Sequence, residues 1–306
     1  MSKIAVIGIS GESIFMKLDN LPTPSVTSHA KNCHIEPGGK GYNQAVACKK
    51  FNSDVTYLTK VGNDNYGLYC KDYMDKLQIK NNFIIDNENK TAVATILTDK
   101  LGENEVIVYP GASQNLSKED VKSFENEIKQ SDILLVQYEI GLEALKEAIK
   151  IAKDNNVFII LNPAPAIYKD KTLLEIVDIV TPNFEEAKTL YNIPNNISIN
   201  EIGEYLKDIV NNTLIITLGS KGCLLIKDKK YQYFSSYKVD AIDTTGAGDI
   251  FNAGLASTIL NESIEYSIQF AQAASAISVT RQYVMDAIPS IAEIKEFINI
   301  YNLKEK

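Results

Sequence analysis

Short apolar runs rich in β-branched residues recur along this chain, and amphipathic stretches separate them. The runs lie at residues 3–9, 55–59, 133–136, 157–161, 176–181 and 214–218. Such runs are typical of strands that are buried on both faces. Strands that alternate with helices form a mainly parallel sheet with helices on each side. The sequence therefore predicts a three-layer α/β/α sandwich, with functional loops at the carboxyl ends of the strands.

Two segments, residues 12–36 and 83–110, lack convincing helices and depart from this alternation. The second reads as a hairpin, with strands at 91–99 and 105–109 around a turn at 101–104. We expect the two segments to form a small antiparallel sheet that acts as a lid on a single domain spanning residues 1–306. A decorative edge or a dimer contact is the alternative interpretation.

Charge and composition exclude several classes of function. The chain of 306 residues has a formal net charge of −8, and its basic residues do not gather into one run, so we expect no nucleic-acid partner. The first apolar run is too short to span a bilayer, which predicts no membrane association. The four cysteines lack the paired spacing of a zinc site and indicate a reduced, cytoplasmic setting. The only histidines, His29 and His34, lie in a polar stretch that predicts a solvated loop rather than a metal site.

The most informative motif is Asp243-Thr244-Thr245-Gly246-Ala247-Gly248-Asp249, which small and apolar residues follow at helical spacing. A glycine turn that opens a helix exposes unpaired amides and the positive end of the helix dipole, which together favour an anion. Such an anion can be a phosphoryl group in transfer. Asp249 falls in the first helical turn, where a carboxylate can accept the proton of a hydroxyl. Asp at this place is common as a cap, but the glycines favour a general base.

Two further motifs offer donors and carboxylates. Gly38-Gly39-Lys40-Gly41 opens another helix without Walker A spacing, and Lys40 and Asn43 can bond the hydroxyls of a ligand. Asn183 and Glu186 follow the run at 176–181 and are three residues apart. That pair predicts a site for magnesium-bound water or a helix capping box, and both can hold at once.

A fourth loop, Thr217-Leu218-Gly219-Ser220-Lys221-Gly222, follows the run at 214–218. Its glycines allow a nucleotide to lie against the backbone, although a plain turn is an equal alternative for the loop alone. Each of the four loops leaves a predicted strand or enters a helix, so all can converge on one crevice. The set predicts an ATP-dependent small-molecule kinase.

With these motifs in this order, the chain resembles the PfkB carbohydrate kinase family, and most closely its ribokinase branch, from Lys3 to Pro289. The segment Asn162-Pro163-Ala164-Pro165-Ala166 also fits the resemblance. It implies an α/β/α sandwich with a β-sheet lid, ATP and Mg²⁺ as cofactors, a sugar or sugar-like substrate, and a homodimer formed through the lid.

The resemblance also implies roles for single residues. Asp249 would be the catalytic base, and Gly246, Ala247 and Gly248 the anion hole. The residues that would face the sugar are Gly11, Ser13, Gly38, Gly39, Lys40, Asn43 and Glu139. The ATP-binding residues would be Asn183, Thr217, Gly219, Ser220 and Gly222. Glu186 would hold Mg²⁺ through water, and Asp243 and Thr245 would lie at a site for a monovalent cation such as K⁺.

Four positions depart from the ribokinase pattern. Gly11 and Ser13 replace an Asn-x-Asp pair that grips sugar hydroxyls, and Glu12 between them should point the other way. A lost carboxylate removes about 2 to 3 kcal/mol of discrimination, which puts ribose itself in question. Tyr42 replaces a small residue and either stacks on a substrate ring or fills space. Tyr283 replaces a glycine of the cation turn, and its Cβ disfavours left-handed backbone, so K⁺ activation is uncertain.

These departures leave two other hypotheses open. A nucleoside kinase of the same fold would use an aromatic side chain such as Tyr42 against the base. A catalytically silent sugar or nucleotide sensor would keep the scaffold alone. Intact Asp249, Gly246, Gly248 and Glu186 argue against a silent protein.

Overall fold

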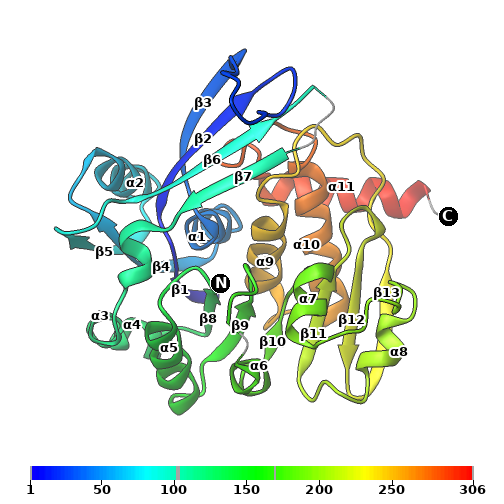
Figure 1. Cartoon of the computed structure of the whole chain (residues 1–306). Helices are drawn as coiled ribbons and strands as arrows, with labels where there is room; N and C mark the ends of the chain where they lie inside the picture. Colours follow the sequence, from blue (N-terminus) through cyan, green and yellow to red (C-terminus); the bar gives the residue numbers. More distant parts are fainter. Residues whose placement is uncertain (1, 101–103, 169, 305–306) are drawn as a thin grey trace.

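The structure, a computed structural model, describes residues 2–100, 104–168 and 170–304 (Figure 1). The strands of its larger sheet are β1 (Lys3–Ile7), β4 (Asp54–Gly62), β5 (Lys80–Asp86), β8 (Ile133–Gln137), β9 (Phe158–Asn162), β10 (Ile179–Val180), β11 (Thr213–Thr217), β12 (Cys223–Lys227) and β13 (Lys230–Phe234). Their order is β13-β12-β11-β10-β9-β8-β1-β4-β5. All neighbours from β5 to β11 pair in parallel, and among these strands only β12 is reversed, pairing antiparallel with β11 on one side and β13 on the other. The mainly parallel sheet is thus confirmed.

Helices cover both faces of this sheet (Figure 1). One face carries α1 (Lys40–Lys50), α2 (Asn65–Lys76), α9 (Ala247–Thr258), α10 (Ile264–Ser278) and α11 (Ile291–Lys304). The other carries α3 (Lys118–Ser123), α4 (Glu125–Lys129), α5 (Leu142–Asp154), α6 (Lys171–Ile176), α7 (Phe184–Leu190) and α8 (Ile202–Leu206). In β1, Ile4 and Val6 pack into the first core while Ala5 and Ile7 pack into the second. A strand buried on both sides is what a continuous apolar run predicts.

A second sheet, hereafter the lid, contains β2 (Gly11–Lys17), β3 (Asn32–Gly38), β6 (Ala92–Thr98) and β7 (Asn104–Tyr109), and it projects above the larger sheet (Figure 1). Its order is β3-β2-β6-β7. β2 pairs with β6 in parallel, so the prediction of a purely antiparallel lid was wrong at that pair. Residues 83–86 belong to β5 of the larger sheet, and the second lid segment therefore starts only at Ala92. The predicted turn at 101–104 falls largely outside the described residues.

Two local predictions need correction. The expected strand at 176–181 shrinks to Ile179–Val180, because Asp170 caps α6 and this helix continues to Ile176. His34 does not lie in a solvated loop. It lies in β3, with its ring stacked on Tyr283 at a centroid distance of 3.7 Å.

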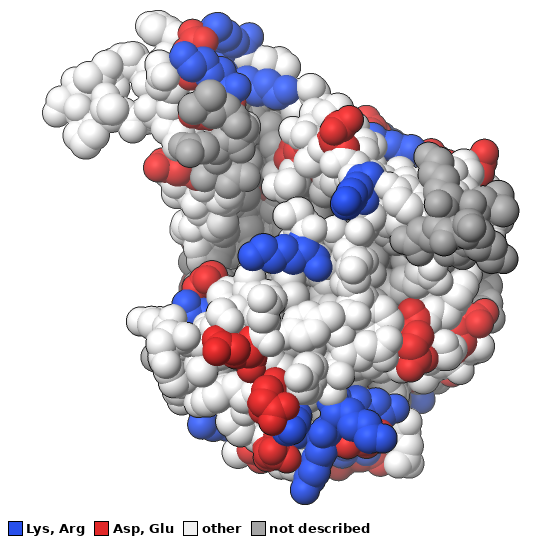
Figure 2. All heavy atoms as spheres, turned by 90° about the vertical axis from the view of Figure 1, so that its right-hand side faces the viewer, with Lys and Arg blue, Asp and Glu red and all other residues white. Residues whose placement is uncertain are grey.

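The described part of the chain also shows the state of its cysteines, the character of its helices and the distribution of its surface charge. The four cysteines are free thiols; Cys33 is exposed and the other three are buried. Among the described helices none has the length and apolarity needed to cross a membrane. Acidic and basic side chains are interspersed over the face shown in Figure 2, and no broad basic patch is visible on its described surface.

Candidate active site

The turn at residues 246–248, hereafter the anion turn, opens α9. Gly246 caps the helix with φ of 74°, in the left-handed region that favours glycine. A Cβ at this position would lie 2.7 Å from Val284 Cγ1, so glycine is required for space as well. A Cβ at Gly248 would meet nothing within 4 Å, which leaves that side of the turn open to a ligand. Asp249 follows in the first turn of α9 and is 6% exposed.

Helix α1 supplies two amide side chains to Asp249. Asn43 Nδ2 donates to Asp249 Oδ2 at 2.9 Å, and Gln44 Nε2 donates to Oδ1 at 3.0 Å. The helix comes this close because its cap, Gly39, has φ of 105° and no room for a Cβ beside Ile9. Burial raises the pKa of Asp249, whereas the charge of Lys40 and the two amide donors act against that rise.

Gln44 also joins Asp249 to the ends of neighbouring strands. Its Nε2 donates to Asn162 Oδ1 at 3.1 Å, and its Oε1 accepts from Gln137 Nε2 at 2.6 Å. Gln137 and Asn162 are the last residues of β8 and β9, where an open parallel sheet places its ligands. Sequence reasoning missed Gln44, although its position directly after Asn43 in the second glycine cluster was a usable signal.

The same network reaches the anion turn from behind. Asn162 Nδ2 donates to Thr181 O at 2.9 Å, and Thr181 Oγ1 hydrogen-bonds Asn252 Oδ1 at 2.5 Å. Asn252 Nδ2 in turn donates to Gly248 O at 2.8 Å. Asp249 and the anion turn are therefore both fixed to the carboxyl ends of the central strands.

Lys40 lies among three carboxyl groups. Its backbone N–H donates to Glu139 Oε2 at 3.0 Å. Burial alone would lower the pKa of the Lys40 ammonium, but the charges of Glu139, Asp249 and Glu186 outweigh it and raise the pKa. Burial raises the pKa of Glu139 to about 7, with Lys40 opposing the shift and Asp249 adding to it. The cluster combines one cation with three carboxyl groups whose pKa values are all raised by burial.

Asn183 and Glu186 form the capping box of α7. Asn183 Oδ1 accepts from Glu186 N at 2.9 Å, and Glu186 Oε2 accepts from Asn183 N at 2.8 Å. Burial raises the pKa of Glu186, and its charge still interacts with Lys40 and Asp249. The described residues contain no group of three or more His, Cys, Asp or Glu that could hold a metal by themselves. A lone carboxylate at this place fits Mg²⁺ that is held mainly by water and nucleotide phosphates.

Gly11 and Ser13 lie on the inner face of β2. A Cβ at Gly11 would be 2.4 Å from Ala92 O, so this position has no room for any side chain. Ser13 Oγ lies directly against Gly38, only 2.2 Å from where a Cβ of that glycine would be. Glu12 points the other way, toward Tyr66 and Asp64, as the alternation of a strand predicts.

Tyr42 fills the core and does not face a ligand. Its side chain is fully buried, its hydroxyl donates to Cys70 O at 2.8 Å, and its ring meets Tyr57 edge-on. Cys70 Sγ in turn contacts Gly11 O at 3.2 Å. The space-filling interpretation is thus confirmed, and stacking of Tyr42 on a substrate ring was the wrong alternative.

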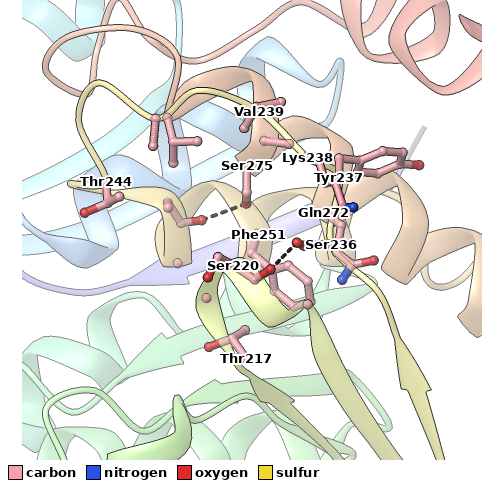
Figure 3. A pocket seen from close by; sticks show the side chains of 17 residues that line it. Thr217, Ser220, Ser236, Tyr237, Lys238, Val239, Thr244, Phe251, Gln272 and Ser275 are labelled. Atoms are coloured by element: carbon pink, nitrogen blue, oxygen red, sulfur yellow. Dashed lines mark hydrogen bonds between the residues drawn. The ribbon is translucent and has the colours of Figure 1, made fainter. Parts of the chain in front are cut away.

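A cavity of about 500 Å³ extends from the anion turn along β11 and α10 (Figure 3). Six of the predicted residues line this cavity: Thr217, Gly219, Ser220, Gly222, Ala247 and Gly248. Asn183, which was predicted to bind ATP, does not line it. Sequence reasoning missed Val239 and Gln272, which form other parts of the wall. The signal available for α10 was its many small residues, which let Ser275 Oγ reach Ala247 O at 2.8 Å.

The predicted cation residues belong to one tight loop. Asp243 Oδ1 accepts from Thr245 N at 2.9 Å, and Oδ2 accepts from Tyr283 N at 3.1 Å. Tyr283 has φ of 66°, so it adopts the left-handed conformation despite its Cβ. Such strain costs about 1 to 3 kcal/mol, and the stack on His34 with an edge contact to Phe15 offsets part of it.

Comparison with known proteins agrees with this geometry. Residues 1–291 match the family described as pfkB family carbohydrate kinase. A ribokinase of Haemophilus influenzae is 35% identical over 96% of this chain and 98% of its own length. A deoxyribokinase of Salmonella typhimurium is 30% identical over 97% and 99%. The crystal structure of a ribokinase from Thermotoga maritima superposes with a TM-score of 0.86 at 34% identity and covers 98% of this chain and 100% of that one.

Proposed function

Because this chain belongs to the pfkB family of carbohydrate kinases and is an ATP-dependent sugar kinase of the ribokinase type, we propose that Asp249 is its general base and that its acceptor is a pentose. We further propose that it accepts 2-deoxyribose as well as ribose. The observation that carries the first proposal is the junction of a glycine turn, a buried carboxylate and a nucleotide-sized cavity at the start of α9.

In the proposed reaction, a sugar hydroxyl attacks the terminal phosphorus of ATP while Asp249 accepts its proton. The bond between that phosphorus and the bridging oxygen of ADP breaks, and the electron pair leaves with ADP. The amides of the anion turn stabilise the extra negative charge on the transferring group. Asn43 and Gln44 hold the carboxylate so that its oxygens face the hydroxyl. Magnesium bound to the phosphates would neutralise their charge, and Glu186 is the residue that would hold its water.

The residues proposed to face the sugar support a pentose substrate and tolerate the loss of one of its hydroxyls. Asn43 Oδ1 is buried and has no hydrogen-bond partner among the described residues, so it can accept from a sugar hydroxyl. Glu139 can accept from another. A serine hydroxyl at position 13 bonds one sugar hydroxyl, whereas a carboxylate would bond two. A sugar that lacks one hydroxyl therefore loses less here. The relatives named ribokinase and deoxyribokinase cover 96% and 97% of this chain.

The test is ADP release over ribose, 2-deoxyribose, other pentoses, hexoses and nucleosides. We expect kcat/KM for ribose and 2-deoxyribose to lie within about tenfold of each other, because position 13 has no carboxylate to distinguish them. Ser13→Asp should raise the ratio of ribose to 2-deoxyribose by about 30-fold, which corresponds to about 2 kcal/mol. Glu12→Gln, on the opposite face of β2, is the matched control and should leave the ratio unchanged.

Several outcomes would contradict the proposal. A wild-type preference for ribose above about 100-fold would remove the role assigned to Ser13. Preferred turnover of a nucleoside would favour the nucleoside kinase, which has lost the support of Tyr42. Ligand-induced shifts in melting temperature without any turnover would favour the silent sensor.

The lid supports a homodimer, and ATP dependence supports a cytoplasmic setting. Val106, Ile107 and Val108 on the edge strand β7 are about half exposed or more, and Ile35 on β3 is 46% exposed. An exposed apolar edge strand favours pairing with a second copy. We expect light scattering to show a dimer for the wild type and a monomer for Ile107→Lys.

Because Tyr283 keeps the left-handed turn, we also propose that K⁺ activates the enzyme. Equal rates in K⁺ and in a sodium buffer would contradict this.

A further inference from the structure

Glu36 is a buried carboxylate that the proposed reaction does not use. It lies on β3 opposite Ser13 and is 5% exposed. Its Oε1 accepts from Val284 N at 2.8 Å and its Oε2 accepts from Met285 N at 3.3 Å. Burial of a carboxylate costs free energy unless hydrogen bonds compensate it, and here the two backbone amides provide those bonds. Burial raises the pKa of Glu36, and the two amides and His34 oppose the rise.

The turn that Glu36 holds, residues 283–285, also contacts the loop at residues 243–246. Tyr283 N donates to Asp243 Oδ2, and the side chain of Val284 packs directly on Gly246. The space between Gly246 and the Val284 side chain is too small for a methyl group, because a Cβ on Gly246 would lie 2.7 Å from Val284 Cγ1. Movement of this turn would therefore shift the first residue of the anion turn.

The inner face of the lid docks on the same turn at further points. His34 stacks on Tyr283, Phe15 meets its ring at 5.3 Å, and Asn32 Nδ2 donates to its hydroxyl at 3.3 Å. Ser13 shares this face, because side chains alternate along a strand. The lid surface proposed to bind the sugar is thus continuous with the surface that holds the turn.

We infer that Glu36 is a positioning residue that couples the lid to the anion turn. It bonds the amides of Val284 and Met285 when the lid is docked, and Val284 then keeps Gly246 in the geometry that aims the amides at the phosphoryl group. This inference rests on the proposed function, because it assigns the lid to the sugar and the anion turn to phosphoryl transfer.

The test compares Glu36→Ala, Glu36→Gln and wild type, with Glu12→Gln as a control that alters a buried lid carboxyl facing the other way. We expect Glu36→Ala to lower kcat by about 30-fold with the KM for ATP within about twofold. Glu36→Gln keeps one acceptor oxygen and should restore most of kcat. A merely structural role would lower the melting temperature of both Glu36 variants without this split.

A double variant tests the route through Val284. Val284→Ala keeps the amide that Glu36 binds but removes the contact with Gly246, so it should lower kcat to a similar extent. The double variant Glu36→Ala/Val284→Ala should then be little worse than either single variant. Independent, multiplying effects on kcat would overturn the inference.

Hydrogen exchange gives a readout that does not depend on turnover. We expect Glu36→Ala to speed exchange at residues 284–285 and also at 247–249, whereas Glu12→Gln changes neither. Faster exchange at 284–285 alone would overturn the coupling even in an inactive protein. Absence of turnover in the wild type, with the coupled exchange intact, would instead refute the proposed function.

Discussion

The hydrogen bond from Gln44 to Asp249 gives the sharpest test of how the pKa of the proposed base is set. Gln44 Nε2 donates to Asp249 Oδ1 at 3.0 Å and to Asn162 Oδ1 at 3.1 Å, and it is fully buried. Gln44→Met keeps a similar length but removes both donors. The variant leaves Asp249, its other hydrogen-bond donor Asn43 and the anion turn unchanged.

The size and sign of the effect follow from the charge of the acceptor. A hydrogen bond to a charged group contributes about 1.5 to 3 kcal/mol, and about 1.36 kcal/mol corresponds to a pKa shift of one unit. Loss of a donor to the carboxylate favours its protonated form, and a protonated base cannot accept the sugar proton. The acid limb of kcat/KM should therefore move to higher pH by about one to two units. Asn162 Oδ1 and Gln137 Nε2 also lose a partner, which destabilises the fold by about 1 to 3 kcal/mol.

The assay is the pH dependence of ADP release at saturating ATP, with melting temperature measured on the same samples. Val46→Ala is the matched control, because Val46 is fully buried in the same helix and should lower the melting temperature without moving the acid limb. A uniform fall in activity at every pH, with the acid limb of Gln44→Met unmoved, would refute the claim that Gln44 tunes the base.

Three other changes follow from the same geometry. Asp249→Asn should lower kcat by about 100- to 10,000-fold with little effect on ATP affinity, measured by single-turnover kinetics and nucleotide titration, and near-normal turnover would exclude it as the base. Gly246→Ala should lower kcat at an unchanged KM for sugar, because its Cβ meets Val284 and its φ is positive. With a pKa of about 7, Glu139 gains its charge as pH rises through neutrality and then accepts sugar hydroxyls better, so the sugar KM should fall over that range. Glu139→Gln should abolish this inflection, and an inflection that persists would assign it to another group.

The sheet was predictable because buried parallel strands leave a local pattern. The apolar runs at 3–9, 133–136 and 214–218 each correspond to a strand within two residues at either end. The run at 176–181 failed because an apolar helix end and a short strand adjoin there, and hydrophobicity alone does not separate them. The parallel pairing of β2 with β6 also escaped prediction, because strand direction is decided by connections that residue patterns do not encode.

The site was predictable where backbone geometry demands glycine. Gly39 and Gly246 both have positive φ, and each caps a helix. These two helices place Asn43 Nδ2 2.9 Å from Asp249 Oδ2. Residues that act through tertiary contacts gave no such signal. Glu36 and Val284 lie 248 positions apart in the chain, and only the docked lid brings them together.

The departures from the ribokinase pattern are compensated locally and do not indicate decay of the site. Gly11 has no room for a side chain beside Ala92, while its carbonyl is held by Cys70, whose own carbonyl is bonded by Tyr42. Loss of the glycine at 283 is offset in the same way, since the Tyr283 ring packs on the lid and its amide still reaches Asp243. A silent protein would have no reason to keep these contacts while also holding Asp249 in two hydrogen bonds. Under the proposed function, the altered positions change what the lid can bind, and the groups proposed to transfer the phosphoryl group are left in place.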